Sequence, residues 1–286
     1  MQHSFQGAQW LVPDWPGAPD NIAFVCTTRR GGVSPEPYGP GPQEIATAGG
    51  GLNLGVHVGD DPANVAFNRA IVRGRLPSEP AWLSQVHGSV VARADRVARG
   101  SVPEADASIA TMPGAICAIQ TADCLPVLFT DRAGTVVGAA HAGWRGLAGG
   151  VLEATVAAMR AELAPAGSAD GDPAGNEIIA WLGAAIGPQE FEVGEEVLQA
   201  FLAGAASSAS LADEEAAVRA AFVPRGSMPG KYLADIYTLA RLALRRVGVS
   251  QVAGGDLCTV TDASRFYSYR RDKLTGRQAS LIWIKQ

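Results

Sequence analysis

The sequence predicts an α+β fold in which sheets are covered by helices. Short apolar runs bounded by turn residues recur along the 286 residues, as is typical of buried strands. Longer segments with apolar residues every three or four positions lie between them and indicate amphipathic helices. Because strand pairs are mixed with single helices and no short repeat is visible, sheets flanked by helices are the expected architecture.

The composition indicates a globular protein with a large core. A net charge of −5 with 47% hydrophobic residues and a pI near 5.4 argue against a general nucleic-acid binder. No apolar run reaches the ~18 residues of a membrane span, and residues 1–15 lack the pattern of a signal peptide. We therefore expect a cytoplasmic protein whose partners include neither nucleic acid nor membrane. Its four widely spaced cysteines are expected to be reduced thiols.

The N-terminal part should begin with a strand at 21–28 (NIAFVCTT), with 29–32 (RRGG) as its exit turn. Residues 39–50 lie in a stretch rich in Gly and Pro and are expected to form a flexible loop. A helix should run over 62–75, since aspartates precede it and a proline stands in its first turn.

The middle of the chain is expected to supply many of the strands. The apolar runs there are short and end at turn residues, such as the DRAG hairpin turn at 131–134. The predicted strands cover 81–86, 89–94, 106–110, 115–120, 125–130 and 135–140.

The C-terminal half is expected to alternate helices and strands. The predicted helices cover 147–163, 193–202 and 233–247. The predicted strands cover 178–182, 257–261 and 279–284. Between them, 165–176 is expected to be a flexible linker because it holds Pro, Gly, Ser and Asp, and 203–220 is expected to be a loop with a short helix.

Three clusters of polar residues and glycine follow apolar runs that are predicted to be strands. They are SQVHG at 84–88, TADCLP at 121–126 and AHAGWRG at 140–146. They carry His87, Cys124 and His141. Two imidazoles and one thiolate suit a catalytic zinc site, which has three protein ligands and one open position. The wide sequence separations exclude a zinc finger with local ligand pairs.

Other interpretations of the same residues remain open. In the first alternative, His87 and His141 are ordinary turn residues and Cys124 is a thiol in the core. A metal-free site would use Cys124 as the nucleophile and His141 as its base. Asp123 either orients an imidazole, accepts a proton or caps the next turn.

Aromatic and basic residues near these strand ends are candidates for substrate binding. Arg29 and Arg145 either hold an anion or form structural salt bridges. Trp144 is expected to supply a flat apolar wall. The turn at 267–277 (YSYRRDKLTGR) is either a hairpin with solvated charges or a wall that faces substrate.

The chain resembles the YfiH-like family. The motifs that carry this resemblance are TTRRGGVS (27–34), LNLG (52–55), HVGDD (57–61), QVHG (85–88), ADA (105–107), TADCLPV (121–127), HAGWRG (141–146), IGP (186–188), FEVG (191–194), FYSYRRD (266–272) and TGR (275–277). That family was named for a laccase-type polyphenol oxidase activity and is described as zinc-dependent purine nucleoside phosphorylases with adenosine deaminase activity. The loop at 39–50 is longer than the family leads us to expect, and the Ala-rich insert near 203–220 is unusual for it.

The resemblance implies a fold, a metal and substrates. The fold would be a single domain over 1–286 with four α/β/β/α layers, like the catalytic domain of cytotoxic necrotizing factor. His87, Cys124 and His141 would bind zinc, with copper as the alternative. The substrates would be a purine nucleoside and phosphate, and the protein a monomer or small homo-oligomer.

Three rival functions are considered for the same residues. A laccase mechanism needs many histidines, and the chain has only His3, His57, His87 and His141, so we reject it. A Cys–His hydrolase or amidase is the second rival, since the family also includes a factor linked to editing of peptidoglycan precursors. A metal-binding module without activity is the least favoured, because an open coordination position would then have no purpose.

Overall fold

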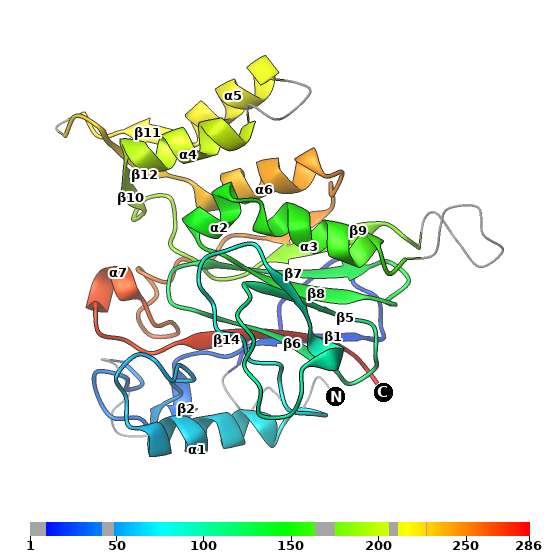
Figure 1. Ribbon diagram of the computed structural model, residues 1–286. Coiled ribbons are helices and arrows are strands. Elements are labelled where there is room, and N and C mark those ends of the chain that lie inside the picture. Colours follow the sequence, from blue (N-terminus) through cyan, green and yellow to red (C-terminus); the bar gives the residue numbers. More distant parts are fainter. Residues whose placement is uncertain (1–9, 42–48, 164–174, 206–210, 227) are drawn as a thin grey trace.

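A six-stranded sheet lies at the centre of the fold (Figure 1). The computed structural model describes residues 10–41, 49–163, 175–205, 211–226 and 228–286. The strand order of the sheet is β13-β9-β7-β8-β5-β4. Its strands are β4 (Val91–Arg93), β5 (Ala107–Ala110), β7 (Leu125–Asp131), β8 (Val137–Ala142), β9 (Ile178–Leu182) and β13 (Val252–Gly254). The pairs β13–β9 and β4–β5 are parallel and the others antiparallel.

A three-stranded antiparallel sheet packs against one face of the larger sheet. It has the order β1-β14-β6, with β1 (Ile22–Cys26), β14 (Gln278–Ile284) and β6 (Ile116–Thr121). Apolar side chains from both sheets fill the space between them, among them Leu128, Ile119 and Ile282. This cluster explains why these strands are apolar along their whole length: each has protein on both faces.

Helices cover the other face of the six-stranded sheet (Figure 1). They are α2 (Trp144–Ala148), α3 (Val151–Arg160) and α6 (Ile236–Arg246). The helix α6 buries Leu239, Leu242 and Ala243 in the core that it shares with α3 and the sheet. Asp235 caps α6 by accepting hydrogen bonds from the backbone at its first turn.

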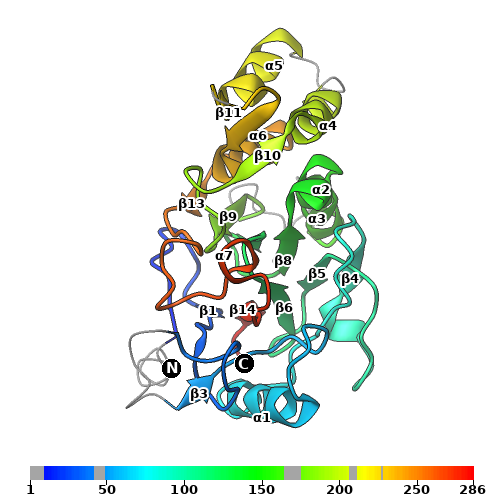
Figure 2. The ribbon, with the colours of Figure 1, turned by 90° about the vertical axis from the view of Figure 1, so that its left-hand side faces the viewer.

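The helix α1 (Pro62–Arg73) covers the outer face of the three-stranded sheet (Figure 2). Its Val72 packs with Leu281 and Trp283 of β14. Asp61 caps the helix and Pro62 stands in its first turn, so the predicted helix and its start are confirmed.

Smaller elements complete the fold. A sheet of order β10-β12-β11 and the helices α4 and α5 lie beyond α6 and α2 (Figure 2). The remaining elements are β2 (Arg30–Gly32), β3 (Gly50–Gly51), η3 (Ala94–Arg96), β10 (Glu192–Gly194), α4 (Glu195–Ala205), α5 (Leu211–Ala220), β11 (Phe222–Pro224), β12 (Lys231–Ala234) and α7 (Tyr269–Asp272).

The predicted mixed α/β architecture is confirmed, but some elements differ. The strand predicted at 81–86 is wrong: only single bridges form there, at Ala81 and Ser84. The strand predicted at 257–261 is also wrong, with one bridge at Cys258. Residues 30–32 pair as strand β2 where an exit turn was expected.

The long helix predicted at 147–163 is two helices, because Gly149 and Gly150 separate α2 from α3. Gly150 has φ +87°, a left-handed conformation that interrupts a helix and suits glycine. The loops predicted at 39–50 and 165–176 lie largely outside the described residues. No helix within the described ranges combines the length and apolarity that a membrane crossing requires.

Candidate metal centre and active site

His87, Cys124 and His141 converge on one point although they are far apart in the sequence. The Cys124 Sγ lies 3.7 Å from Nε2 of His87. One potential ligand atom from each residue lies within 4.8 Å of the other two. The two imidazole rings meet edge to face, with centroids 4.7 Å apart. Two imidazoles and one thiol are thus placed where they can share an ion.

Sheet register brings two of these residues together. His141 lies in β8 opposite Pro126 of β7, and Cys124 immediately precedes β7. At Asp123 the chain bends sharply between β6 and β7, with φ +89°. The cysteine at the start of one strand therefore lies beside the histidine near the end of its antiparallel neighbour.

His87 reaches the cluster from a loop, not from a strand end as predicted. It has φ +63°, an uncommon conformation for a residue with a side chain. The carboxylate of Asp106 holds this loop by accepting hydrogen bonds from three successive backbone N–H groups, those of Val86 (3.1 Å), His87 (2.9 Å) and Gly88 (2.7 Å).

Asp106 also orients the second histidine. Its Oδ1 lies 2.8 Å from Nδ1 of His141, and its side chain is fully buried. This contact favours the tautomer with the proton on Nδ1, which leaves the Nε2 lone pair available to an ion. The sequence prediction overlooked Asp106. A lone carboxylate at the start of the apolar run ADASIA (105–110) was the available clue, since buried charges need partners.

Gly143 allows the close approach of the cluster to the backbone. A Cβ at this position would lie 2.7 Å from Cδ2 of His87 and 2.9 Å from Sγ of Cys124. Any side chain at Gly143 therefore forces the histidine and the cysteine to move. The glycine of the HAGWRG motif is needed for space.

The half-buried thiol of Cys124 and the buried imidazole of His141 stabilise each other's charged form. Burial acts to raise the pKa of Cys124, but the imidazoles of His141 and His87 outweigh it and lower this pKa to about 6. Burial acts to lower the pKa of His141, but the Cys124 thiolate and Asp106 raise it to about 9. In the protein without metal, Cys124 is therefore a thiolate beside a protonated imidazole at neutral pH.

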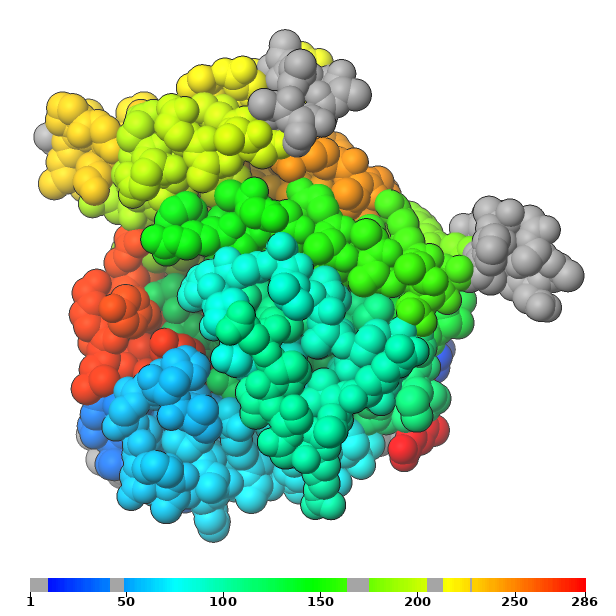
Figure 3. Space-filling view, in the orientation of Figure 1, coloured from blue at the N-terminus to red at the C-terminus, as the bar shows by residue number. Residues whose placement is uncertain are grey.

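A cavity of about 300 Å³ opens beside the cluster, which is within the size range of small-molecule sites. Its lining residues are His57, Leu83, Gln85, His87, Gln120, Thr121, Ala122, Cys124, His141, Tyr269 and Arg277. In Figure 3 the red segment around α7, the light-blue segment after β3 and the cyan segment near residue 85 surround a recess with green atoms set back in it.

The contacts of Asp123 do not match the imidazole-orienting role, one of the three roles considered for it. Its Oδ1 accepts a hydrogen bond from the Thr259 hydroxyl (2.6 Å) and its Oδ2 accepts one from the backbone N–H of Arg270 (2.6 Å). The carboxylate thus connects the β6–β7 bend to the 259–270 segment. The imidazole-orienting carboxylate is Asp106.

The two arginines proposed from the sequence do not line the cavity. The Arg29 guanidinium is buried, donates to the carbonyls of Gly39 (3.0 Å) and Ala263 (3.1 Å) and stacks on Tyr267. The exposed Arg145 lies over the ring of Trp144.

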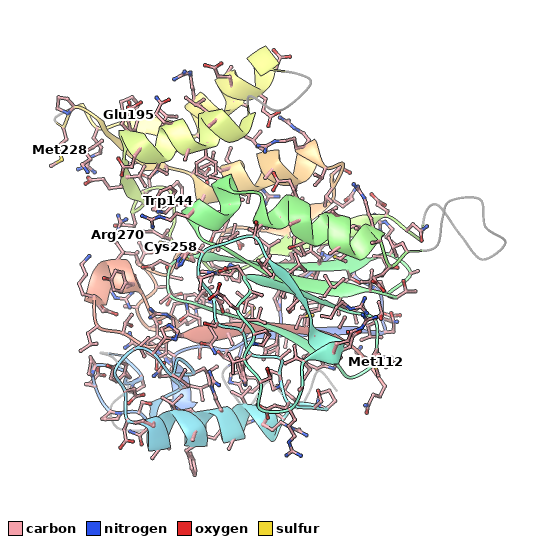
Figure 4. All side chains as sticks on the ribbon, in the orientation of Figure 1. Met112, Trp144, Glu195, Met228, Cys258 and Arg270 are labelled. Atoms are coloured by element: carbon pink, nitrogen blue, oxygen red, sulfur yellow. The ribbon has the colours of Figure 1, made fainter. Side chains whose placement is uncertain are left out.

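Trp144 does not line the cavity either. It stands at the start of α2 (Figure 4) and packs against the core between the helices and the six-stranded sheet. The 267–277 turn does reach the cavity, through Tyr269 and Arg277, and it contains the helix α7.

The donor set fits a zinc ion. Zinc binds imidazole nitrogen at ~2.0–2.1 Å and thiolate sulfur at ~2.3 Å, so two such ligands at a tetrahedral angle lie about 3.6 Å apart. The distance between Sγ of Cys124 and Nε2 of His87 is 3.7 Å. The thiolate favoured by the low pKa of Cys124 is the form that binds metal. The cavity leaves one side of the cluster open.

The fold and the cluster define a mixed α/β protein with a His–Cys–His site, suited to a metal, in the wall of a cavity. Residues 23–285 match the family described as multi-copper polyphenol oxidoreductase laccase. The chain belongs to this family, which confirms the YfiH-like resemblance.

Close relatives are known across the whole length. The purine nucleoside phosphorylase PA4543 of Pseudomonas aeruginosa is 50% identical over 96% of this chain and 98% of its own. Purine nucleoside phosphorylase YfiH of Escherichia coli is 49% identical with the same coverage. A Neisseria meningitidis protein of known crystal structure is 46% identical and superposes with a TM-score of 0.79, covering 97% of this chain and 99% of that one.

Proposed function

We propose that this protein is a zinc-dependent purine nucleoside phosphorylase that also deaminates adenosine. The observation that carries the proposal is the His–Cys–His cluster, which faces a cavity of about 300 Å³. Relatives at about half identity over nearly the full chain carry the name purine nucleoside phosphorylase, which supports the reaction class.

In phosphorolysis, a phosphate oxygen forms a bond to the anomeric carbon of ribose while the bond to the purine nitrogen breaks. The purine leaves with the electron pair and takes up a proton, which gives the free base and ribose 1-phosphate. In deamination, water replaces the amino group of adenosine and ammonia leaves. Both reactions need an oriented substrate and a way to stabilise charge as the bond breaks.

The residues of the chain have distinct tasks in this proposal. His87, Cys124 and His141 hold the zinc, which supplies Lewis-acid chemistry when bound. Asp106 keeps Nε2 of His141 directed at the site and fixes the loop of His87. Tyr269, Leu83 and Gln120 line the cavity and offer both apolar and hydrogen-bonding surface to a nucleoside.

The test is metal analysis followed by a nucleoside panel. Protein purified without added metal should contain about one zinc per chain, and copper in its place would identify the alternative metal. Adenosine and inosine should release base only when phosphate is present, and adenosine should yield inosine without it. Zinc-free protein that cleaves nucleosides at full rate would rule out the metal-dependent proposal.

A Cys–His hydrolase is the second candidate, favoured by one observation. The Cys124 thiol has a pKa lowered to about 6 beside His87 and His141, as an activated nucleophile does. Amide substrates would be cleaved through a covalent acyl group on Cys124. Mass spectrometry of the protein mixed with an amide substrate would detect such an adduct. Hydrolysis by this route would not need the metal.

We further propose that residues 1–286 form one domain with the α/β/β/α layering of the cytotoxic necrotizing factor catalytic domain. Three features support this layering (Figure 1). The helices α2, α3 and α6 cover the six-stranded sheet, the two sheets pack face to face, and α1 covers the outer face of the three-stranded sheet. We also propose a cytoplasmic monomer or small homo-oligomer that acts on small molecules. Scattering in solution would measure the oligomeric state.

A further inference from the structure

Arg277 is the arginine that lines the cavity beside the metal cluster. Its guanidinium is partly buried, and Nη1 donates to the carbonyls of Gly276 (3.0 Å) and Thr275 (3.3 Å). Among the described residues, Nε and Nη2 of Arg277 have no hydrogen-bond acceptor and its guanidinium has no ion-pair partner. The cavity wall thus holds a cation with N–H groups available to a ligand.

The backbone and stem of Arg277 are held in place by the segment after β3. The Arg277 N–H donates to Oδ1 of the buried Asn53 (2.9 Å), and the Leu54 N–H donates to the Arg277 carbonyl (3.1 Å). The stem lies so close to Gly55 that a Cβ there would be 2.7 Å from Cγ of Arg277. An arginine fixed in this way loses little freedom when it binds an anion.

The surroundings of Arg277 favour an anion. His57 lines the same cavity, and burial together with the charges of Arg277 and Arg69 lowers its pKa, so it is a neutral N–H donor at neutral pH. The nearby carboxylate of Asp123 is already bonded to Thr259 and to the backbone of Arg270. Burial lowers the pKa of Arg277 overall, although the Cys124 thiolate also lies close enough to act on this pKa. Among the described residues no carboxylate forms an ion pair with the Arg277 guanidinium, so its N–H groups remain available to an anion.

We propose that Arg277, with His57 beside it, forms the phosphate subsite of this cavity. This inference rests on the proposed phosphorolysis and names the group that binds its second substrate. A guanidinium recognises phosphate oxygens through paired, charge-assisted hydrogen bonds. The subsite shares its cavity with the metal cluster, so a bound phosphate lies in the same space as the nucleoside.

The experiment compares full-length, zinc-loaded wild type with Arg277→Gln, Arg277→Lys and Gly55→Ala. The control is Arg219→Gln, which removes an exposed arginine of α5 that pairs with Glu215. Inorganic phosphate is titrated into each protein by calorimetry in the absence of nucleoside. Steady-state kinetics then give the KM for phosphate and for nucleoside separately, and adenosine 5′-monophosphate is titrated as a second probe.

Arg277→Gln should weaken phosphate binding and raise the KM for phosphate by about 10- to 100-fold, with the nucleoside KM changed less than about twofold. Arg277→Lys should be intermediate, because it keeps the charge but not the paired geometry. Gly55→Ala should also weaken phosphate binding, since it displaces the arginine stem while the guanidinium remains. The control should match wild type.

Two results would contradict the phosphate subsite, and a third would contradict only the proposed function. Wild-type phosphate affinity in Arg277→Gln would overturn the subsite. If Arg277→Gln weakened the binding of adenosine 5′-monophosphate but not that of inorganic phosphate, the ligand of the subsite would be a nucleotide and not inorganic phosphate. Phosphate binding that needs Arg277, in a protein that cleaves no nucleoside, would leave the subsite standing and refute the proposed function.

Discussion

The carboxylate of Asp106 lies 2.8 Å from Nδ1 of His141, and the same carboxylate accepts the backbone N–H of His87 at 2.9 Å. One fully buried side chain thus positions two of the three residues of the cluster. The two histidines come from a loop and a strand that share no backbone pairing in this region, so their mutual placement depends on this contact.

Asp106→Asn should weaken zinc binding by about 10- to 100-fold, the usual effect of removing the group that orients a metal-binding histidine. The amide keeps the size of the side chain but places an N–H₂ group among donors, so about 1–3 kcal/mol of unfolding free energy should also be lost. A competitive chelator titration and a denaturant titration measure the two effects.

The matched control for this substitution is Asp131→Asn. Asp131 is equally buried and accepts hydrogen bonds from the backbone of Thr135 and Val136 at the β7–β8 turn. Loss of the Asp131 carboxylate should reduce the free energy of unfolding without changing the affinity for zinc. Equal zinc loss in both variants would show that Asp106 acts only through general stability.

Cys124→Ser should lose both zinc and activity, because an alcohol is a poor zinc ligand at neutral pH. Cys117→Ala should lose stability and keep zinc, since Cys117 is fully buried between the two sheets. Elemental analysis and turnover per folded molecule separate these outcomes. Full zinc with lost turnover in Cys124→Ser would favour the nucleophile interpretation.

Much of the fold was predictable from local pattern. The strands near 21–28, 125–130 and 279–284 were predicted because buried strands with protein on both faces are apolar throughout. The strand at 81–86 was wrong: Ala81 and Ser84 form only single bridges, and Val86 at its end, like His87 after it, gives its backbone N–H to the side chain of Asp106 and not to a neighbouring strand. Local composition does not reveal such a partner.

The candidate site was predictable in part, for a similar reason. His87, Cys124 and His141 stand beside glycines and turn residues, and these residue types together indicated one site. The 267–277 turn was considered as a wall that faces substrate, but Arg277 was not singled out in it, because its place in the cavity depends on segments more than two hundred residues apart. Arg29 and Arg145 were favoured by proximity to predicted strand ends, which says nothing about where a long side chain points.

Gly143→Ala should disturb the cluster although it adds only one carbon. The new Cβ would contact both the His87 ring and the Cys124 sulfur at less than 3.0 Å, so both must move. Zinc affinity should fall by at least tenfold, since ligand placement is critical at these distances. Gly226→Ala is the control, because no atom of the described residues beyond its chain neighbours lies within 4 Å of the added carbon. Unchanged zinc affinity in Gly143→Ala would contradict this prediction and show that His87 and Cys124 can shift without losing the metal.

In the metal-free protein, Cys124 should react at unusually low pH. The pKa of Cys124 is lowered to about 6 from 9.0, so its thiolate fraction rises between pH 5 and 7 and is nearly complete by pH 8. Burial raises the pKa of Cys26 and Cys117 to about 12, which keeps them protonated throughout. Burial acts to raise the pKa of Cys258, but hydrogen bonds from Thr261 and from the backbone outweigh it and lower this pKa, so the label on Cys258 is quantified separately. Alkylation by iodoacetamide, followed by mass spectrometry, should therefore label Cys124 with a rate that is half-maximal near pH 6. Zinc should block the reaction, because it occupies the sulfur. A rate that keeps rising toward pH 9 would show that His141 does not stabilise the thiolate.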